Sequence, residues 1–401
     1  MTTFLNDFGV VCALGNNKSE VKQALNHPER EYQSLDHELH LEGEPVYVGK
    51  VIGELPDMSA FPSYQQTRNN ALALMAVQQL EPTLSPLLAK FDSQRIAVII
   101  GTTTAGVRTA EEAVAHYMAT DAFPAEYGHQ CQELIAPAQF LAEYLGADGP
   151  TYTISTACSS STKVIMTAHM LLDTDMADVV LCGGVDSLCQ LTVNGFEALD
   201  STSQSLCEPF SESRDGINLG EAAAFFVMSK QPGPVALLGV GETSDAYHIS
   251  APDPSGDGAI RAINIALEMA NRTPEDVDYI NLHGTGTIKN DEMESRAVYT
   301  LFSDKAPCSS TKRLTGHTLG AAGALELGLC WLHLTDVDTP MPPHKMTKPR
   351  DESLHPIKLV QSVTKQNSRI CLSNSFAFGG NNISVLIGLA DAAKIDMTST
   401  C

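Results

Sequence analysis

Cys158 stands where a cysteine could serve as a nucleophile. The strand-like run 151–155 leads into it and the helix-like run 159–172 follows it, so the thiol is predicted to lie in the first turn of a helix. Unpaired backbone N–H groups and the positive end of the helix dipole favour a thiolate there. The same N–H groups could stabilise an oxyanion on a bound acyl group. A small buried cysteine at a tight helix entry is the alternative, and this segment alone does not separate the two.

Two histidines could assist such a thiol. His283 ends the strand-like run 277–282, at the carboxyl end of a strand, where α/β proteins place their chemistry. His317 stands just before 319–334, a helix-like run rich in small residues. Either histidine alone could equally be a buried structural residue. In a fold with two similar halves, however, the helix starts at Cys158 and His317 could converge on one site.

The elements that must position these residues alternate between strands and helices, which predicts an α/β fold with a mostly parallel sheet. The rhythm repeats, so we expect two similar halves, 1–230 with the cysteine and 231–401 with both histidines. The polar, acidic segment 27–58 is expected to lie on the surface. Strands are predicted at 95–104, 151–155, 177–183, 235–240, 277–282, 370–373 and 383–389, and helices at 109–118, 159–172, 259–270, 291–302 and 319–334.

The composition excludes several classes of function. The 401 residues include 25 Lys and Arg against 48 Asp and Glu, a net charge of −23, which argues against nucleic-acid binding and against a polybasic membrane anchor. No apolar run reaches the length of about 18 residues that a membrane span needs, and the first residues do not resemble a secretory signal. The ten cysteines form no CxxC pair. We therefore expect a cytoplasmic protein with free thiols and no metal site.

Together, these segments resemble the elongating β-ketoacyl-[acyl-carrier-protein] synthases of the thiolase superfamily, over essentially the whole chain. The set Cys158, His283 and His317 distinguishes the elongating type, because thiolases carry a second cysteine and initiating synthases carry Cys-His-Asn. The resemblance implies a five-layered α-β-α-β-α thiolase fold. Its anchors are STACSSS around Cys158, CGGVD at 182–186, PFSESRDGINLGEAAAFFVMSK at 209–230, SDAYHISAPDPSGDGA at 244–259, HGTGTIKNDEMES at 283–295, TKRLTGHTLGAAG at 311–323 and SNSFAFGGNN at 373–382.

The resemblance also implies a reaction, a decarboxylative Claisen condensation. Cys158 would take an acyl group from a carrier protein, whose phosphopantetheine arm delivers it, so no bound cofactor is expected. His283 and His317 would bind malonyl-carrier protein and assist its decarboxylation. The product would be a β-ketoacyl-carrier protein two carbons longer. The HGTGT and SSS sequences are closer to polyketide-type members, so polyene or aryl-polyene synthesis and fatty-acid elongation both stay open.

Further residues are carried over from the family's motifs. Lys312 and its acidic partner Glu294 would organise the site through an ion pair. The backbone N–H groups of Cys158 and Phe378 would form the oxyanion hole. Ala377 stands where many members have glycine, so the hinge of this loop could differ. The pantetheine arm would be held by Thr285, Thr287, Phe376, Phe378 and Gly379.

The partners implied are an acyl carrier protein and a second subunit, either another copy of this chain or a chain-length factor. Carrier proteins are acidic, so docking on a chain of charge −23 needs a local basic patch. The candidates are Arg68, Arg108 and Arg313. A non-catalytic chain-length factor is an alternative function, although such subunits typically lack the cysteine. A thiolase-fold enzyme acting on CoA esters is another.

Overall fold

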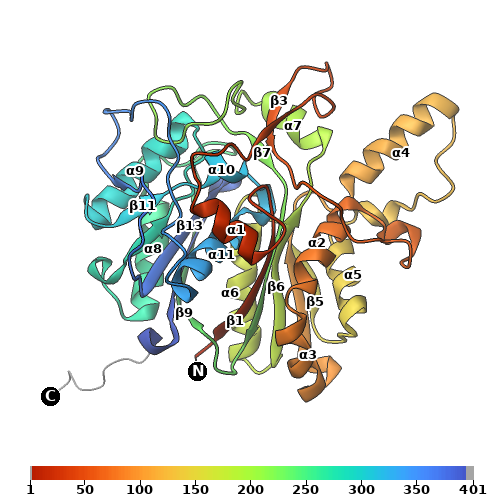
Figure 1. Cartoon of the computed structure of the whole chain (residues 1–401), viewed down its shortest axis with the longest axis horizontal. Coiled ribbons are helices and arrows are strands. Elements are labelled where there is room, and N and C mark those ends of the chain that lie inside the picture. The colour runs from red at the N-terminus through yellow and green to blue at the C-terminus, as the bar shows by residue number, and fades with distance from the viewer. Residues whose placement is uncertain (1, 394–401) are drawn as a thin grey trace.

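The structure is a computed structural model, and it describes residues 2–393; Cys401 lies outside them. Its centre is an eleven-stranded mixed sheet, flanked by helices, with a separate three-stranded sheet at one side (Figure 1). The strands of the large sheet run in the order β12-β11-β10-β13-β14-β9-β1-β8-β6-β4-β5. No helix among residues 2–393 is both long enough and apolar enough to cross a bilayer.

The large sheet consists of two halves with the same topology. If the strands of each half are numbered in chain order, both half-sheets have the strand order 3-2-4-5-1. Strands 3, 2 and 4 are parallel to one another, and strand 5 is antiparallel to both of its neighbours, strands 4 and 1. One half contains β1 (Phe4–Val11), β4 (Ile96–Gly101), β5 (Thr151–Ile154), β6 (Val179–Asp186) and β8 (Ala222–Ser229). The other contains β9 (Val235–Ser244), β10 (Tyr279–Asn281), β11 (Pro307–Ser309), β13 (Ile370–Ala377) and β14 (Asn381–Leu389), with β12 (Lys358–Leu359) at its edge.

The helices lie in three layers around these two half-sheets. α6 (Ser160–Asp173) and α11 (Ala322–Thr335) pack against each other and against strands of both halves, so they form the middle layer. Residues 322–334 of α11 are all buried, as expected for a helix enclosed between two sheets. α2 (Arg68–Gln78) and α5 (Ala136–Leu145) cover one outer face, and α8 (Asp257–Ala270) and α9 (Ile288–Phe302) cover the other. These layers confirm the five-layered thiolase fold.

Every strand and helix predicted from the sequence is present, with ends shifted by a few residues. The surface segment 27–58 contains two unpredicted strands, β2 (Ser34–Asp36) and β3 (Val46–Gly49), which form the small sheet with β7 (Leu219–Gly220). β8 ends at Ser229 and β9 begins at Val235, while a division into two units at residue 230 stays a prediction. The remaining helices are α1 (Lys18–Leu25), α3 (Glu81–Lys90), α4 (Val107–Thr120), α7 (Gln190–Glu197) and α10 (Lys312–Thr315).

Candidate active site

Cys158 lies in the connection from β5 to α6, one residue before the N-cap Ser159. Its neighbour Ala157 has a φ of 52°, a left-handed conformation that is uncommon for a residue with a Cβ atom. The Ser160 hydroxyl holds this turn, since it accepts from the Thr156 N–H and donates to the Ala157 carbonyl. Such strained turns cluster at functional sites, where the surrounding structure holds them. The turn presents the thiol just before the amino end of α6, one residue before its N-cap and not in its first turn as expected.

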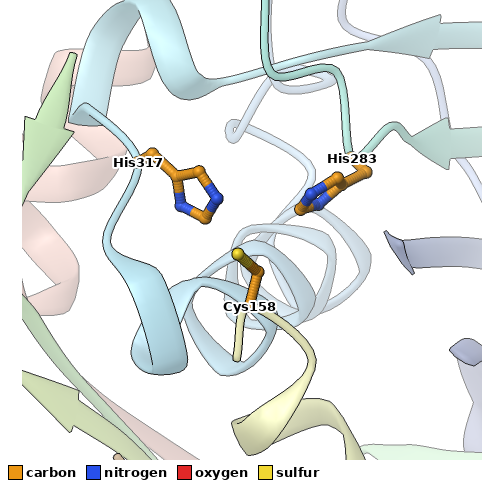
Figure 2. Close-up of side chains that lie close together, drawn as sticks. All are labelled: Cys158, His283 and His317. Atoms are coloured by element: carbon orange, nitrogen blue, oxygen red, sulfur yellow. The ribbon is translucent and has the colours of Figure 1, made fainter. Parts of the chain in front are cut away.

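The two histidines come from the other half and meet this thiol. The sulfur and one ring nitrogen of each histidine all lie within 4.8 Å of one another. Figure 2 shows the Cys158 sulfur pointing toward the space between the His283 and His317 rings. The ring centres are 5.5 Å apart and nearly perpendicular, at 83°. Three segments that are far apart in the sequence therefore form one site.

The surroundings of His317 select its tautomer. Its Nδ1 accepts a hydrogen bond from the Leu319 N–H at 3.1 Å, so in the neutral ring the proton is on Nε2. Its backbone N–H donates to the Asn218 carbonyl at 2.7 Å, which fixes the residue's place beside the thiol. His283 is less constrained, because its Nδ1 has no hydrogen-bond partner among residues 2–393.

Burial sets the protonation of all three groups. Desolvation, with a smaller effect from the Lys312 charge, lowers the pKa of both His283 and His317 well below the usual value, so both rings are neutral at pH 7. Neutral imidazoles can donate N–H bonds to a developing enolate. Burial also raises the pKa of Cys158 to about 12, more than nearby Lys312 lowers it. The expectation that this position favours a thiolate was therefore wrong, because desolvation by burial is the largest effect on the thiol's pKa.

Lys312 is buried beside His283, but its ion-pair partner is not the predicted one. Its ammonium donates to the His283 carbonyl at 2.5 Å and pairs with the Glu326 carboxylate, and both side chains of this ion pair are almost fully buried. The ion pair predicted with Glu294 was wrong. Glu294 instead accepts the backbone N–H groups of His283 at 2.7 Å and Gly284 at 2.6 Å, and burial raises its pKa to about 7. Glu294 thus holds the turn that carries His283.

A cavity of about 260 Å³ leads to the thiol and the two rings. Thr285, Thr287, Phe376 and Phe378 line it, whereas Gly379 lies in the adjoining turn, with a φ of 79°. The concern about Ala377 was wrong, because its backbone is extended, at φ −102°, and left-handed conformations fall on the following glycines. The sequence analysis missed other lining residues. Phe196, Leu199 and Asp200 belong to no motif, whereas Asp215 and Ile217 lie in the motif at 209–230 but were not singled out.

Two of the three arginines predicted for carrier docking are already engaged inside the protein. Arg68 forms a two-point ion pair with the fully buried Glu221, at 2.5 and 2.8 Å. The Arg313 side chain is 3% exposed and bonds to Glu31 at 2.7 Å. As a docking residue Arg313 was therefore wrong, because its guanidinium is buried, whereas Arg68, whose side chain is 22% exposed, stays a prediction. Arg108 is partly exposed and near Glu112, so it stays a prediction.

The donor atoms of Cys158, His283 and His317 are also spaced closely enough to ligate a soft metal ion. Geometry alone does not choose between acyl transfer and metal binding. The choice between them comes from proteins of known sequence and structure.

Residues 70–232 match the family model for the β-ketoacyl synthase N-terminal domain, and residues 235–344 match that for the C-terminal domain. The chain is 28% identical to 3-oxoacyl-[acyl-carrier-protein] synthase 2 of Staphylococcus aureus strain COL, over 94% of this chain and 96% of the relative. The corresponding Rhizobium meliloti protein is 37% identical over 60% of this chain and 61% of its own. A solved chain from the complex of a ketosynthase with its chain length factor, from Xenorhabdus doucetiae, is 42% identical with a TM-score of 0.92, covering 97% of this chain and 98% of that one. This chain belongs to the β-ketoacyl synthase family.

Proposed function

We propose that this chain condenses an acyl group held on Cys158 with malonyl-carrier protein, as an elongating β-ketoacyl-[acyl-carrier-protein] synthase. The observation that carries the proposal is the approach of the thiol and both neutral imidazoles within 4.8 Å at the end of one cavity. Together with the family assignment, this favours acyl transfer over metal binding.

In the first half-reaction, Cys158 Sγ attacks the acyl thioester and a new carbon–sulfur bond forms. The thioester bond to the phosphopantetheine sulfur breaks, and the thiol's proton ends on that departing sulfur. Because burial keeps the free thiol protonated, the proton must leave as the bond forms, and a neighbouring neutral imidazole can relay it. The backbone N–H groups of Cys158 and Phe378, which both line the cavity, would stabilise the tetrahedral oxyanion.

In the second half-reaction, malonyl thioester occupies the same cavity. The N–H of His317, fixed on Nε2, and that of His283 donate to the thioester oxygen as carbon dioxide leaves. The enolate carbon then attacks the acyl carbon, and the bond from that carbon to Cys158 Sγ breaks. Lys312 acts as a positioning residue here, because its bond to the His283 carbonyl holds that ring in place.

The substrate arrives as a phosphopantetheine thioester, so the protein supplies binding groups but no cofactor of its own. Thr285 and Thr287, whose hydroxyls bond to each other at 2.9 Å, line the cavity and can exchange this bond for the amides of the pantetheine arm. Phe376 and Phe378 supply apolar walls. The acyl chain could belong to a fatty acid, a polyene or an aryl polyene, and the cavity's walls do not select among these.

We also propose a second subunit on the α4 face, either another copy or a chain-length factor. α4 stands away from the body of the protein in Figure 1 and exposes apolar side chains. Tyr117 stacks on Phe123, and Phe123 on Tyr127, near the exposed Met118. Exposed apolar patches of this kind mark subunit interfaces. The solved relative from Xenorhabdus doucetiae is a complex of a ketosynthase with a chain length factor, which supports the heterodimer.

Among the described residues, all nine cysteines are free thiols, which supports our proposal of a cytoplasmic location. The alternative function, a chain-length factor without catalysis, is less favoured because Cys158, His283, His317 and Lys312 are all present and assembled.

Intact-protein mass spectrometry tests the proposed reaction. The wild-type protein and Cys158→Ala are incubated with a panel of acyl-carrier proteins and then with malonyl-carrier protein. We expect a mass gain in the wild-type protein only, lost in the second step as a longer β-ketoacyl-carrier protein forms. Acylation of both proteins would refute Cys158 as the nucleophile. If no donor acylates either protein, even with a co-expressed partner subunit, the non-catalytic alternative is favoured.

A further inference from the structure

The turn that carries Phe378 is linked to the helix that begins beside Cys158 by one buried lysine. Lys163 lies in α6, five residues after the thiol, and its side chain is only 15% exposed. Its ammonium donates to Asn381 Oδ1 at 3.0 Å and lies 3.3 Å from a carboxylate oxygen of Glu242 in β9. No motif of the sequence analysis includes Lys163.

The charge of Lys163 determines which way the Asn381 amide faces. An ammonium group only donates hydrogen bonds, so the amide oxygen must face it. The amide nitrogen is then directed to the opposite side, where it donates to the Phe378 carbonyl at 3.4 Å. This is a long hydrogen bond, which can open without large cost. The lysine thus acts on Phe378 through the orientation of one amide.

The other bonds of this turn attach it to a neighbouring loop and not to the helix of the thiol. The Gly379 N–H donates to the Ile249 carbonyl, and the Asp245 N–H donates to the Gly380 carbonyl, both at 2.8 Å. Gly379 and Gly380 both have positive φ values, of 79° and 76°, which glycine adopts without the steric cost that a Cβ atom would add. The path from Phe378 through Asn381 to Lys163 ties the turn to α6, while a hydrogen bond of 2.8 Å between the Thr162 and Ser375 hydroxyls ties α6 to the strand that leads into the turn.

We propose that Lys163 is a positioning residue that holds the Phe378 turn, and with it the Phe378 backbone N–H, in register with Cys158. This proposal rests on the function proposed above, in which that N–H stabilises the oxyanion. Loss of the lysine lets the Asn381 amide rotate, and the turn then loses its bond to α6. Transition-state stabilisation depends on donors placed to within a fraction of an ångström, so acyl transfer should slow.

Two variants separate positioning from simple stabilisation. Lys163→Met removes the ammonium, so the amide is no longer oriented. Asn381→Asp keeps an ion pair with Lys163 and so preserves stability, but its carboxylate cannot donate to the Phe378 carbonyl. The matched control is Lys345→Met, because Lys345 is similarly buried, 8% exposed, and pairs with the half-exposed Glu31 away from the cavity.

The measurement is the single-turnover rate of acyl transfer to Cys158 from the acyl-carrier protein of the panel that acylates the wild-type protein fastest, with unfolding measured in parallel. We expect Lys163→Met and Asn381→Asp each to slow transfer roughly tenfold, with the double variant no slower, and Lys345→Met to match the wild-type rate. A second readout is the ratio of Cys158 labelling rates by a bulky and a small maleimide, which should rise in both variants.

A wild-type rate in Asn381→Asp would overturn the positioning role, whatever the stability of the variants. So would additive losses in the double variant, which would indicate independent effects. If the wild-type protein itself is not acylated on Cys158, the proposed function fails first. If it is acylated and the variants are equally fast, only the role of Lys163 is refuted.

Discussion

Removing Lys312 should destabilise the protein in a way that depends on pH. In Lys312→Met the Glu326 carboxylate, 2% exposed, loses the ion pair that compensates its burial. Breaking a buried pair from one side costs about 3–5 kcal/mol. The substitution also removes the hydrogen bond that the Lys312 ammonium donates to the His283 carbonyl. We expect the free energy of unfolding, measured in urea at pH 8, to fall by about that amount.

The sign of the pH dependence follows from the carboxyl group. Burial already raises the pKa of Glu326, and without the ammonium it rises further. A carboxyl whose folded pKa exceeds its unfolded pKa contributes stability below the unfolded pKa, which is lost as the pH rises through the folded pKa. The deficit of Lys312→Met should therefore be smaller at pH 5 than at pH 8.

A matched substitution provides the control. Lys345→Met breaks a pair whose carboxylate is 46% exposed, so it should cost only about 0–1 kcal/mol at either pH. The double variant Lys312→Met/Glu326→Leu should recover most of the stability but not the activity, since His283 stays unsupported. A loss below about 1 kcal/mol in Lys312→Met, or an equal loss at pH 5 and pH 8, would refute the reasoning.

Three further outcomes follow from single sites. In His317→Ala, acylation of Cys158 should persist while condensation slows about 10²–10³-fold, as seen by separate assays of the two steps; equal loss in both would contradict the assigned role. Glu294→Gln should flatten the dependence of the free energy of unfolding on pH between 5 and 8. Burial raises the pKa of Glu294 to about 7, so in the wild-type protein this carboxyl loses its proton over that range, whereas glutamine does not titrate. An unchanged pH dependence of unfolding in urea would count against this. Gly328→Ala should lower stability by about 1–3 kcal/mol, although alanine favours helices, because its Cβ would lie 1.9 Å from the Phe8 ring; a rise in Tm would show that the ring can move.

The sequence predicted well those features that depend on short stretches of chain. The strand before His283 and the helix after Cys158 are local patterns, and both are found within a few residues of their expected ends. The convergence of Cys158 and His317 required the idea of two similar halves, which the matching strand orders support. Local periodicity was sufficient to predict these elements, and the repeated alternation of strands and helices was sufficient to predict that Cys158 and His317 converge.

What the sequence could not give depends on distances across the fold. Lys312 forms its ion pair with Glu326 and not with Glu294, and this pairing depends on how three separate segments pack together. Arg68 forms an ion pair with Glu221, a residue 153 positions further along the chain. The protonation of the Cys158 thiol depends on how completely the folded protein buries it. Phe196 reaches the cavity from α7, a short helix whose pattern carries no sign of a pocket.

The matching strand orders have a consequence for how such a catalyst could arise. The thiol belongs to one half, and both imidazoles belong to the other, so neither half alone holds a complete set of reacting groups. A duplicated, symmetric ancestor would have offered the same side chain at both helix starts. The two halves thus share one strand order, while the three side chains proposed to react are distributed unequally between them.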